Sequence, residues 1–147
     1  MVVEIIPYEG IKINDIEIKF GITQEELNAI LGEAAKIEID NIRRETREQR
    51  NGMTFSFIGD KLQNISISRH VKLFYKDVDI FNSENTLDLL SKYAEYEASK
   101  EKKNGYGNFY DLGLSLGGFG DRKIPEKKLA FVFSKDRIRF FKALLTV

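Results

Sequence analysis

Apolar and polar residues alternate along several short stretches of the chain, which is the pattern of half-buried β-strands. The first stretch has apolar residues on both sides of Asn14-Asp15, namely Ile11, Ile13, Ile16, Ile18 and Phe20. It predicts a hairpin or a kinked strand. A second pair of stretches, Met53–Ile58 and Asn64–Ser68, is joined by a Gly59-Asp60 turn. This pair predicts an antiparallel hairpin with one buried face.

A helix start lies between these two hairpins. Thr23 is followed three residues later by Glu26, which is the spacing of a capping box. The next apolar positions share one helical face: Leu27, Ile30 and Leu31. Gly32 fits a C-terminal stop. The sequence therefore predicts a helix over Thr23–Leu31, and it must pack on a sheet because isolated helices this short are marginal in water.

The same order of features returns sixty positions later. Val71-Lys72-Leu73 aligns with Ile11-Lys12-Ile13, and Ser83 aligns with Thr23 ahead of a longer helical pattern over 83–96. Three further stretches alternate after this helix, at Leu112, Leu114 and Leu116, at Leu129, Phe131 and Phe133, and at Ile138 and Phe140. Each predicts a strand.

These patterns predict one domain over residues 1–147, with a first repeat of about 1–70 and a second of about 71–147. The predicted fold class is α+β: a single antiparallel sheet from two tandem helix-plus-strands repeats, with both helices packed on one face. Glu38–Arg50 carries charges of both signs. It is predicted to be a solvated loop rather than a basic binding patch.

The composition narrows the class of partner. The chain has 23 Lys and Arg against 23 Asp and Glu, so it has no global basic field for nucleic acid or membrane. It has no cysteine, which excludes disulfides and thiolate catalysis. The first residues lack a secretion signal, and no apolar run approaches the roughly 20 residues of a membrane span. The expected location is the cytoplasm.

The layout resembles a known group of proteins. A lead-in strand, the motif Phe20-Gly-Ile-Thr-Gln-Glu-Glu-Leu27, Leu31-Gly32 and a strand hairpin are similar to tandem-repeat proteins of the β-lactamase-inhibitor-like fold. The second half ends in the strands Asp111–Leu116 and Leu129–Phe133, as in small bacterial proteins of that type. Many of those resemble immunity proteins of contact-dependent growth inhibition or polymorphic toxin systems. The resemblance implies binding to one cognate toxin domain, and it implies no particular functional residue.

Candidate catalytic groups are few. His70 is the only histidine, and nothing in the sequence pairs it with a nucleophile and an orienting carboxylate. Asp77 and Asp79 are two apart in an extended stretch, so both could project from one face toward a metal ion. Charges that protect a sheet edge are the alternative explanation. The sequence thus predicts no catalytic residue, no metal site and no cofactor.

One predicted surface fits protein docking. The face of the sheet away from the core is predicted to carry small residues, namely Thr54, Ser56, Ser66, Ser68, Gly113, Ser115, Gly117, Ala130, Val132 and Ser134. Large rigid side chains supply most of the energy at protein interfaces. The predicted partner-binding residues on this face and its rim are Phe109, Asp111, Ser115, Arg137, Arg139 and Phe141. The alternative is that half-solvated strands simply favour Ser and Thr.

The predicted function is therefore a non-enzymatic protein-binding inhibitor. Its specific form is an immunity protein that binds and neutralises a cognate toxin domain. A structural or assembly module without a toxin partner is the second hypothesis. A metal-dependent enzyme that uses Asp77 and Asp79 is the third.

Overall fold

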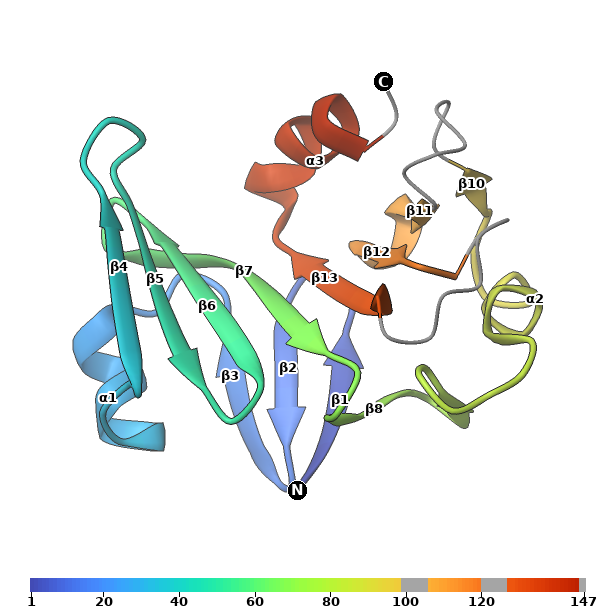
Figure 1. Ribbon diagram of the computed structural model, residues 1–147, viewed down its shortest axis with the longest axis horizontal. Coiled ribbons are helices and arrows are strands. Elements are labelled where there is room, and N and C mark those ends of the chain that lie inside the picture. The colour runs from blue at the N-terminus through green and yellow to red at the C-terminus, as the bar shows by residue number, and fades with distance from the viewer. Residues whose placement is uncertain (99–105, 120–126, 146–147) are drawn as a thin grey trace.

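The protein is built from two β-sheets and three α-helices in the part of the chain that the computed structural model describes, residues 1–98, 106–119 and 127–145 (Figure 1). The helices are α1 (Gln24–Leu31), α2 (Thr86–Leu90) and α3 (Ile138–Leu145). Two 3₁₀ turns precede β12 and α3, at Tyr110–Leu112 and Lys135–Arg137.

The smaller sheet contains the lead-in strands of both halves of the chain. Its order is β3-β2-β1-β8-β9, with β1 (Val2–Ile6), β2 (Gly10–Ile13), β3 (Ile16–Lys19), β8 (Lys72–Tyr75) and β9 (Val78–Asp79). The pair β1–β8 is parallel, and the other neighbours are antiparallel. The predicted hairpin around Asn14-Asp15 is confirmed as β2–β3.

The larger sheet has the order β10-β11-β12-β13-β7-β6-β5-β4. Its strands are β4 (Lys36–Asp40), β5 (Glu45–Arg50), β6 (Met53–Ile58), β7 (Lys61–Ser68), β10 (Glu97–Ala98), β11 (Tyr106–Phe109), β12 (Leu114–Gly117) and β13 (Leu129–Phe133). All of its strand pairs are antiparallel. The predicted hairpin of Met53–Ile58 with the following strand is confirmed as β6–β7.

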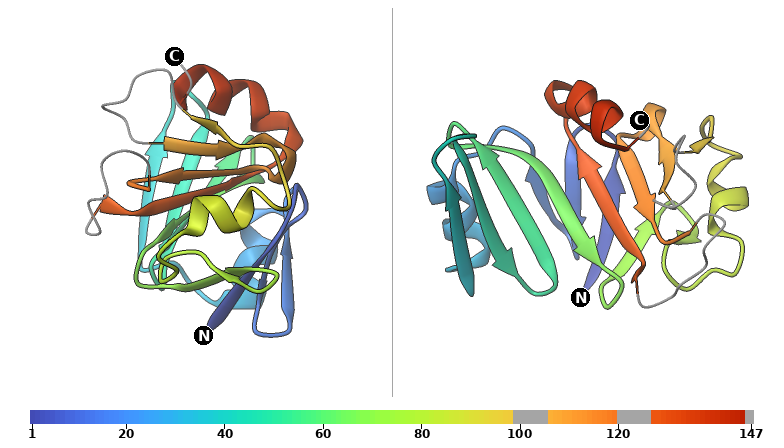
Figure 2. Two further views of the ribbon diagram at one scale, coloured as in Figure 1. Left: turned by 90° about the vertical axis from the view of Figure 1, so that its right-hand side faces the viewer. Right: turned by 45° about the horizontal axis from the view of Figure 1, so that its top comes forward.

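The core lies between the two sheets. The inner face of the larger sheet carries a buried row across five strands: Phe55, Ile65, Val132, Leu114 and Phe109. The smaller sheet contributes Val3, Ile5, Ile11, Ile18 and Leu73. Burying one such side chain contributes about 1.5–3 kcal/mol. Figure 2 shows α1 and α2 at opposite ends of the molecule, on either side of the smaller sheet.

The predicted fold class is wrong. The chain forms two sheets rather than one, and the helices do not all lie on one face, because α3 packs on the outer face of the larger sheet. The reason is the pairing of β1, which lies between β2 and β8 and joins both lead-in hairpins into a separate layer. Alternation shows which residues share a face of a strand, but it does not show which strands pair.

Three predicted elements differ in detail. Glu38–Arg50 is not a loop, because most of it forms β4 and β5. The second helix covers only Thr86–Leu90, and Asn85 rather than Ser83 precedes it. The predicted last strand at Ile138 is a helix, α3. Ile138 and Phe140 are two apart, as on one face of a strand. Ile138 and Phe141 are three apart, which fits one face of a helix equally well.

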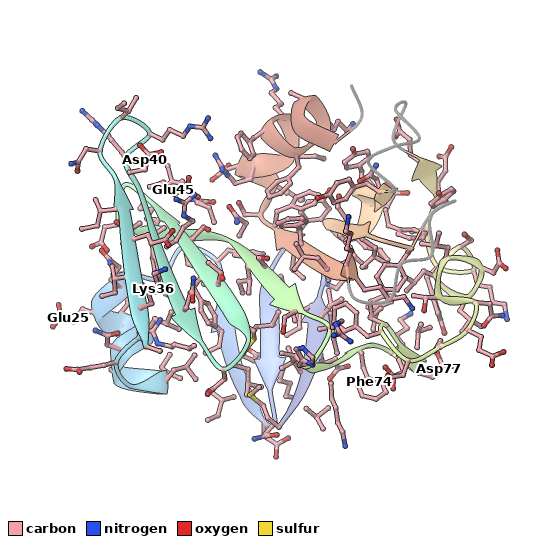
Figure 3. The ribbon with its side chains drawn as sticks, in the orientation of Figure 1. Glu25, Lys36, Asp40, Glu45, Phe74 and Asp77 are labelled. Carbon is pink, nitrogen blue, oxygen red and sulfur yellow. The ribbon has the colours of Figure 1, made fainter. Side chains whose placement is uncertain are left out.

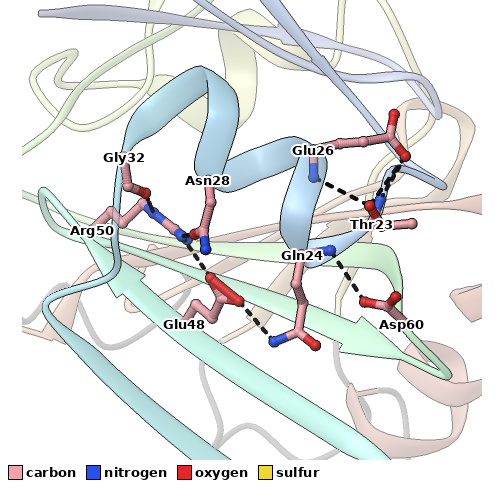
Figure 4. A network of polar contacts seen from close by, with 8 residues as sticks. All are labelled: Thr23, Gln24, Glu26, Asn28, Gly32, Glu48, Arg50 and Asp60. Atoms are coloured by element: carbon pink, nitrogen blue, oxygen red, sulfur yellow. Dashed lines mark hydrogen bonds and ion pairs between the residues drawn. The ribbon is translucent and has the colours of Figure 1, made fainter.

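The capping box at the start of α1 is confirmed (Figure 4). The Glu26 amide donates to Oγ1 of Thr23 at 3.2 Å, and the Thr23 amide donates to Oε1 of Glu26 at 3.2 Å. We therefore expect Thr23→Ala to lower the free energy of unfolding by about 1 kcal/mol, because the Glu26 amide loses its acceptor. Thr23→Ser is the matched control and should retain most of the stability. Urea denaturation tests this, and equal losses in both variants would contradict it.

Candidate functional site

A groove lies on the outer face of the larger sheet, between α3 and strands β5–β7. Its volume is about 310 Å³, and it is lined by Arg43, Glu45, Arg47, Thr54, Ser56, Asn64, Ser66, Phe131, Arg137, Phe140 and Phe141. Figure 3 places Glu45 between β5 and α3, at one side of this groove. We call it the α3 groove.

The floor of the α3 groove is polar because of the strand register. Thr54 lies opposite Ser66 and Ser56 lies opposite Asn64 in the β6–β7 pair, so these four side chains share the outer face. Their small size leaves room between the sheet and α3. The predicted small-residue face is thus present in this part of the sheet.

The wall of the α3 groove is aromatic and rigid. The Phe141 ring stacks on Phe133 with centroids 4.6 Å apart and planes at 15°. It also contacts Phe131 on the neighbouring outer-face position, at 5.6 Å. Phe141 is only 2% exposed, so it fixes α3 to the sheet and leaves Phe140 half-buried at the opening.

Arg137 is the cation at the centre of the α3 groove. Its guanidinium carbon lies 3.9 Å from the centroid of the Phe140 ring. Its Nε is buried and has no hydrogen-bond partner among the residues that the structure describes. Burial lowers the pKa of Arg137, the carboxylate of Glu45 raises it, and Arg43 adds to the lowering. An arginine stays charged even so, and a desolvated cation gains strongly from an anionic partner.

Asn64 supplies a second buried polar atom without a partner. The residue is 6% exposed, and its Oδ1 has no hydrogen-bond partner within residues 1–98, 106–119 and 127–145. Leaving such an atom unpaired costs about 1–3 kcal/mol. The α3 groove therefore presents a donor, Nε of Arg137, and a polar amide side chain, Asn64, to whatever enters it.

The other two arginines of the α3 groove are already paired. Arg47 lies 3.5 Å from a Glu38 oxygen, and Arg43 lies 4.0 Å from an Asp40 oxygen. Both are on the β4–β5 hairpin and are partly exposed. Arg137 has no ion pair within 4.0 Å among the described residues, and the carboxylate that raises its pKa is that of Glu45, another lining residue.

The structure brings together two of the six partner-binding residues predicted from the sequence, Arg137 and Phe141. Phe109 is completely buried on the inner face, so its side chain has no surface for a partner. Ser115 is also completely buried, opposite Phe131 on β13. Asp111 and Arg139 are exposed but do not line the α3 groove.

The predicted orientation of β13 is wrong. Val132 lies opposite Ile65 and Ala130 lies opposite Ile67, so both point into the core rather than away from it. Phe131 and Phe133 lie on the outer face, where Phe141 of α3 packs against both. The largest side chains face outward here because β13 is packed on both faces, so size alone does not identify the core side.

The lining residues missing from the predicted site are Arg43, Glu45, Arg47, Asn64, Phe131 and Phe140. Arg43, Glu45 and Arg47 lie in the segment predicted to be a loop. The predicted outer face carries Ala130 and Val132, so alternation puts Phe131 on the opposite face. A helical assignment of Ile138–Leu145 was the one available signal, since it would have put Phe140 and Phe141 on a helix beside the strands.

The candidate metal residues do not form a cluster. Asp77 accepts a hydrogen bond from the Tyr93 hydroxyl at 2.8 Å, and this bond holds the pKa of Asp77 below its usual range. Asp79 instead accepts from the amide and side chain of Asn82. His70 is exposed in the turn after β7. Among the described residues, no three His, Asp or Glu side chains are grouped to hold a metal ion.

Another cavity, of about 320 Å³, lies beside α2 and is lined by Ser83–Asp88, Ser91, Tyr96, Phe119 and Lys128. Unlike the α3 groove, it has no buried polar atom without a partner among these lining residues. None of the helices in the described parts of the chain has the length and apolarity to cross a membrane.

No protein-family model, curated protein or solved structure matches this chain. The groove has a partly buried cation, an amide oxygen without a partner among the described residues and an aromatic wall.

Proposed function

We propose that the protein is a non-enzymatic binding protein and that its α3 groove receives an acidic segment of a partner protein. The observation that carries the proposal is that Arg137, with a buried Nε that has no partner, and Asn64, with a buried Oδ1 that has no partner, line the same groove in the described part of the chain. Both atoms carry a desolvation cost in the free protein, and a partner that pairs with them removes that cost.

A protein segment fits this pair of atoms better than a simple anion does. Arg137 needs an acceptor, such as a carboxylate, while the Oδ1 of Asn64 needs a donor, such as a backbone amide. One acidic residue in a peptide chain carries both groups. The Phe140 ring at the opening offers apolar contact to the same segment, and buried arginines and aromatics are the residue types that dominate interface energetics.

In its specific form, the proposal keeps the role expected from the sequence: an immunity protein that neutralises a toxin domain by covering it. The support is the sequence resemblance to immunity proteins, although the structure has two sheets and not the single sheet that the resemblance implied, together with the arginine and aromatic lining of the groove. A toxin domain encoded by a neighbouring reading frame would be the partner to test. Co-expression of that toxin with the protein should protect cells, whereas binding without protection would favour an assembly module.

The groove itself can be tested with a defined probe. We expect a short peptide of alternating Glu and Ala to shift the Nε–Hε signal of Arg137 in a ¹⁵N-resolved NMR spectrum, while a Gln-Ala peptide should not. The signals of the exposed Arg139 serve as an internal reference. Equal shifts for both peptides, or shifts only at exposed arginines, would contradict an acid-specific groove.

Matched arginine variants separate the groove from general surface charge. We expect Arg137→Gln to weaken binding of the cognate partner by about 2 kcal/mol, because a desolvated charge pair is lost. Arg139→Gln removes the same charge two residues away and should change the affinity little, since Arg139 is exposed outside the groove. Calorimetry measures both affinities, and thermal melting confirms that each variant folds. Equal losses would place the binding site elsewhere.

A further inference from the structure

We infer that strand β4 is the contact surface for a second copy of this chain, joined edge to edge by antiparallel pairing of the two β4 strands. Within the described ranges 1–98, 106–119 and 127–145, β4 is the last strand of the larger sheet, so only β5 pairs with it and no strand pairs with its other edge. An open edge presents unpaired backbone donors and acceptors, which fit another strand. This inference does not rest on the α3 groove.

Exposed isoleucines mark the same edge. Ile37 is 55% exposed, Ile39 is 68% exposed, and Ile42 at the tip of the hairpin is 96% exposed. Ile37 lies opposite Glu48, so it is on the inner face of the sheet, the side that carries α1. Single exposed apolar residues are common on protein surfaces, but here two lie on one face of β4 and a third lies in the turn that follows it.

The charges of β4 identify the partner as a second copy. Lys36, Glu38 and Asp40 alternate with the isoleucines, and charged residues normally protect an edge from pairing. In the register centred on Ile37, however, each Lys36 lies opposite Glu38 of the other copy. The two Ile37 side chains then meet at the centre, and each Ile39 lies opposite Ala35.

Other symmetric registers are less favourable. Centring the pair on Glu38 would set Lys36 opposite Asp40, but it would place the two Glu38 carboxylates opposite each other. Centring it on Ile39 would set Glu38 opposite Asp40 twice. Like charges directly opposite in a sheet are destabilising. Only the register centred on Ile37 pairs opposite charges without a like-charged pair.

Dimerisation would also place two α3 grooves on one surface. Glu38 lies opposite Arg47, which lies opposite Ser56 and so shares the outer face with the α3 groove. A two-fold axis perpendicular to the sheet keeps the outer faces of both copies on the same side. A partner with two acidic segments could then bind both copies at once.

Sedimentation analysis over a wide range of protein concentration tests the dimer. We expect a reversible monomer–dimer equilibrium for the unaltered chain. Ile37→Lys should raise its dissociation constant by at least about tenfold, since it sets two like charges at the centre. Ile16→Lys is the matched control: Ile16 is 51% exposed on the edge strand β3 and should not affect association. Circular dichroism checks that both variants fold.

Charge exchange tests the register. Lys36→Glu and Glu38→Lys alone should each weaken the dimer by about tenfold or more. An equimolar mixture of the two variants, and the double variant K36E/E38K alone, should restore it, because opposite charges face each other again. The double variant would not dimerise in the register centred on Glu38.

Three results would overturn the inference. The first is a monomer at every concentration, and the second is a dimer that Ile16→Lys disrupts and Ile37→Lys does not. The third is a dimer that none of the charge variants weakens.

Discussion

Replacing Arg50 with methionine is expected to lower the free energy of unfolding by about 3–5 kcal/mol, because the change leaves the buried carboxylate of Glu48 without its cation. The side chains of Arg50 and Glu48 are 3% and 2% exposed, and Nη2 of Arg50 lies 2.6 Å from Oε1 of Glu48. This is a fully enclosed ion pair beneath α1 (Figure 4). Urea denaturation measures the loss.

The size of the effect follows from how many groups depend on Arg50. Its Nε donates to the carbonyl of Gly32 at 3.0 Å, and its Nη2 also donates to Oδ1 of Asn28. The second oxygen of Glu48 accepts from Gln24 at 2.9 Å. The pair therefore holds the start, the middle and the C-terminal end of α1 against β5. Removing the cation leaves several of these groups unsatisfied at once.

The matched control removes both charges. Arg50→Met combined with Glu48→Leu should recover most of the lost stability, since a buried ion pair replaced by apolar residues of similar volume is often neutral or stabilising. Arg50→Lys should recover little, because a lysine lacks the forked geometry that reaches both Gly32 and Asn28. A double variant as unstable as Arg50→Met would show that the destabilisation does not come from the unpaired carboxylate.

The same ion pair shows why part of the fold was not visible in the sequence. The mixed charges of Glu38–Arg50 are typical of a solvated segment. Glu48 and Arg50, however, are two apart in β5, so both lie on its inner face, where they form an ion pair. Only the three-dimensional pairing of a cation and an anion makes such a strand compatible with burial. Sequence patterns record each residue's polarity but not its partner.

Local signals were more reliable than long-range ones. The capping box at Thr23 and the β6–β7 hairpin depend on residues close in sequence, and both are confirmed. The second sheet depends on β1 pairing with β8, about seventy positions away, and nothing in either strand specifies that partner. The two tandem repeats stay a prediction, because the order of strands alone does not establish that the halves are related.

The α3 groove was predictable in composition but not in position. The small residues of β6 and β7 do share a polar outer face, and Arg137 and Phe141 do line the same groove. Phe109 failed as a surface residue because its strand faces the core at that register. The groove exists only because α3 packs over Phe131 and Phe133, and the sequence was interpreted as a strand at that point.

Replacing Phe141 with alanine is expected to cost about 3–5 kcal/mol of stability, the range for truncating a buried phenylalanine. The sequence alone predicts Phe141 as a partner-binding residue at the rim of the sheet face. The structure gives Phe141 a different role, since its ring lies against Phe131, Phe133 and Phe140 and is 2% exposed. Its loss leaves a cavity under α3 and removes the contact that holds the groove wall in place.

The measurement must therefore separate stability from binding. Urea denaturation should show the loss of stability for Phe141→Ala. Amide hydrogen exchange, compared with the unaltered chain, should accelerate most in α3, because the helix loosens where the contact is broken. Phe141→Leu keeps most of the apolar volume and should lose less stability.

Any partner affinity lost in Phe141→Ala should be partly regained in Phe141→Leu, because both substitutions affect binding through the position of α3. In contrast, the affinity lost in Arg137→Gln should come without a matching loss of stability. A Phe141→Ala protein as stable as the unaltered chain but unable to bind would make Phe141 a direct contact after all.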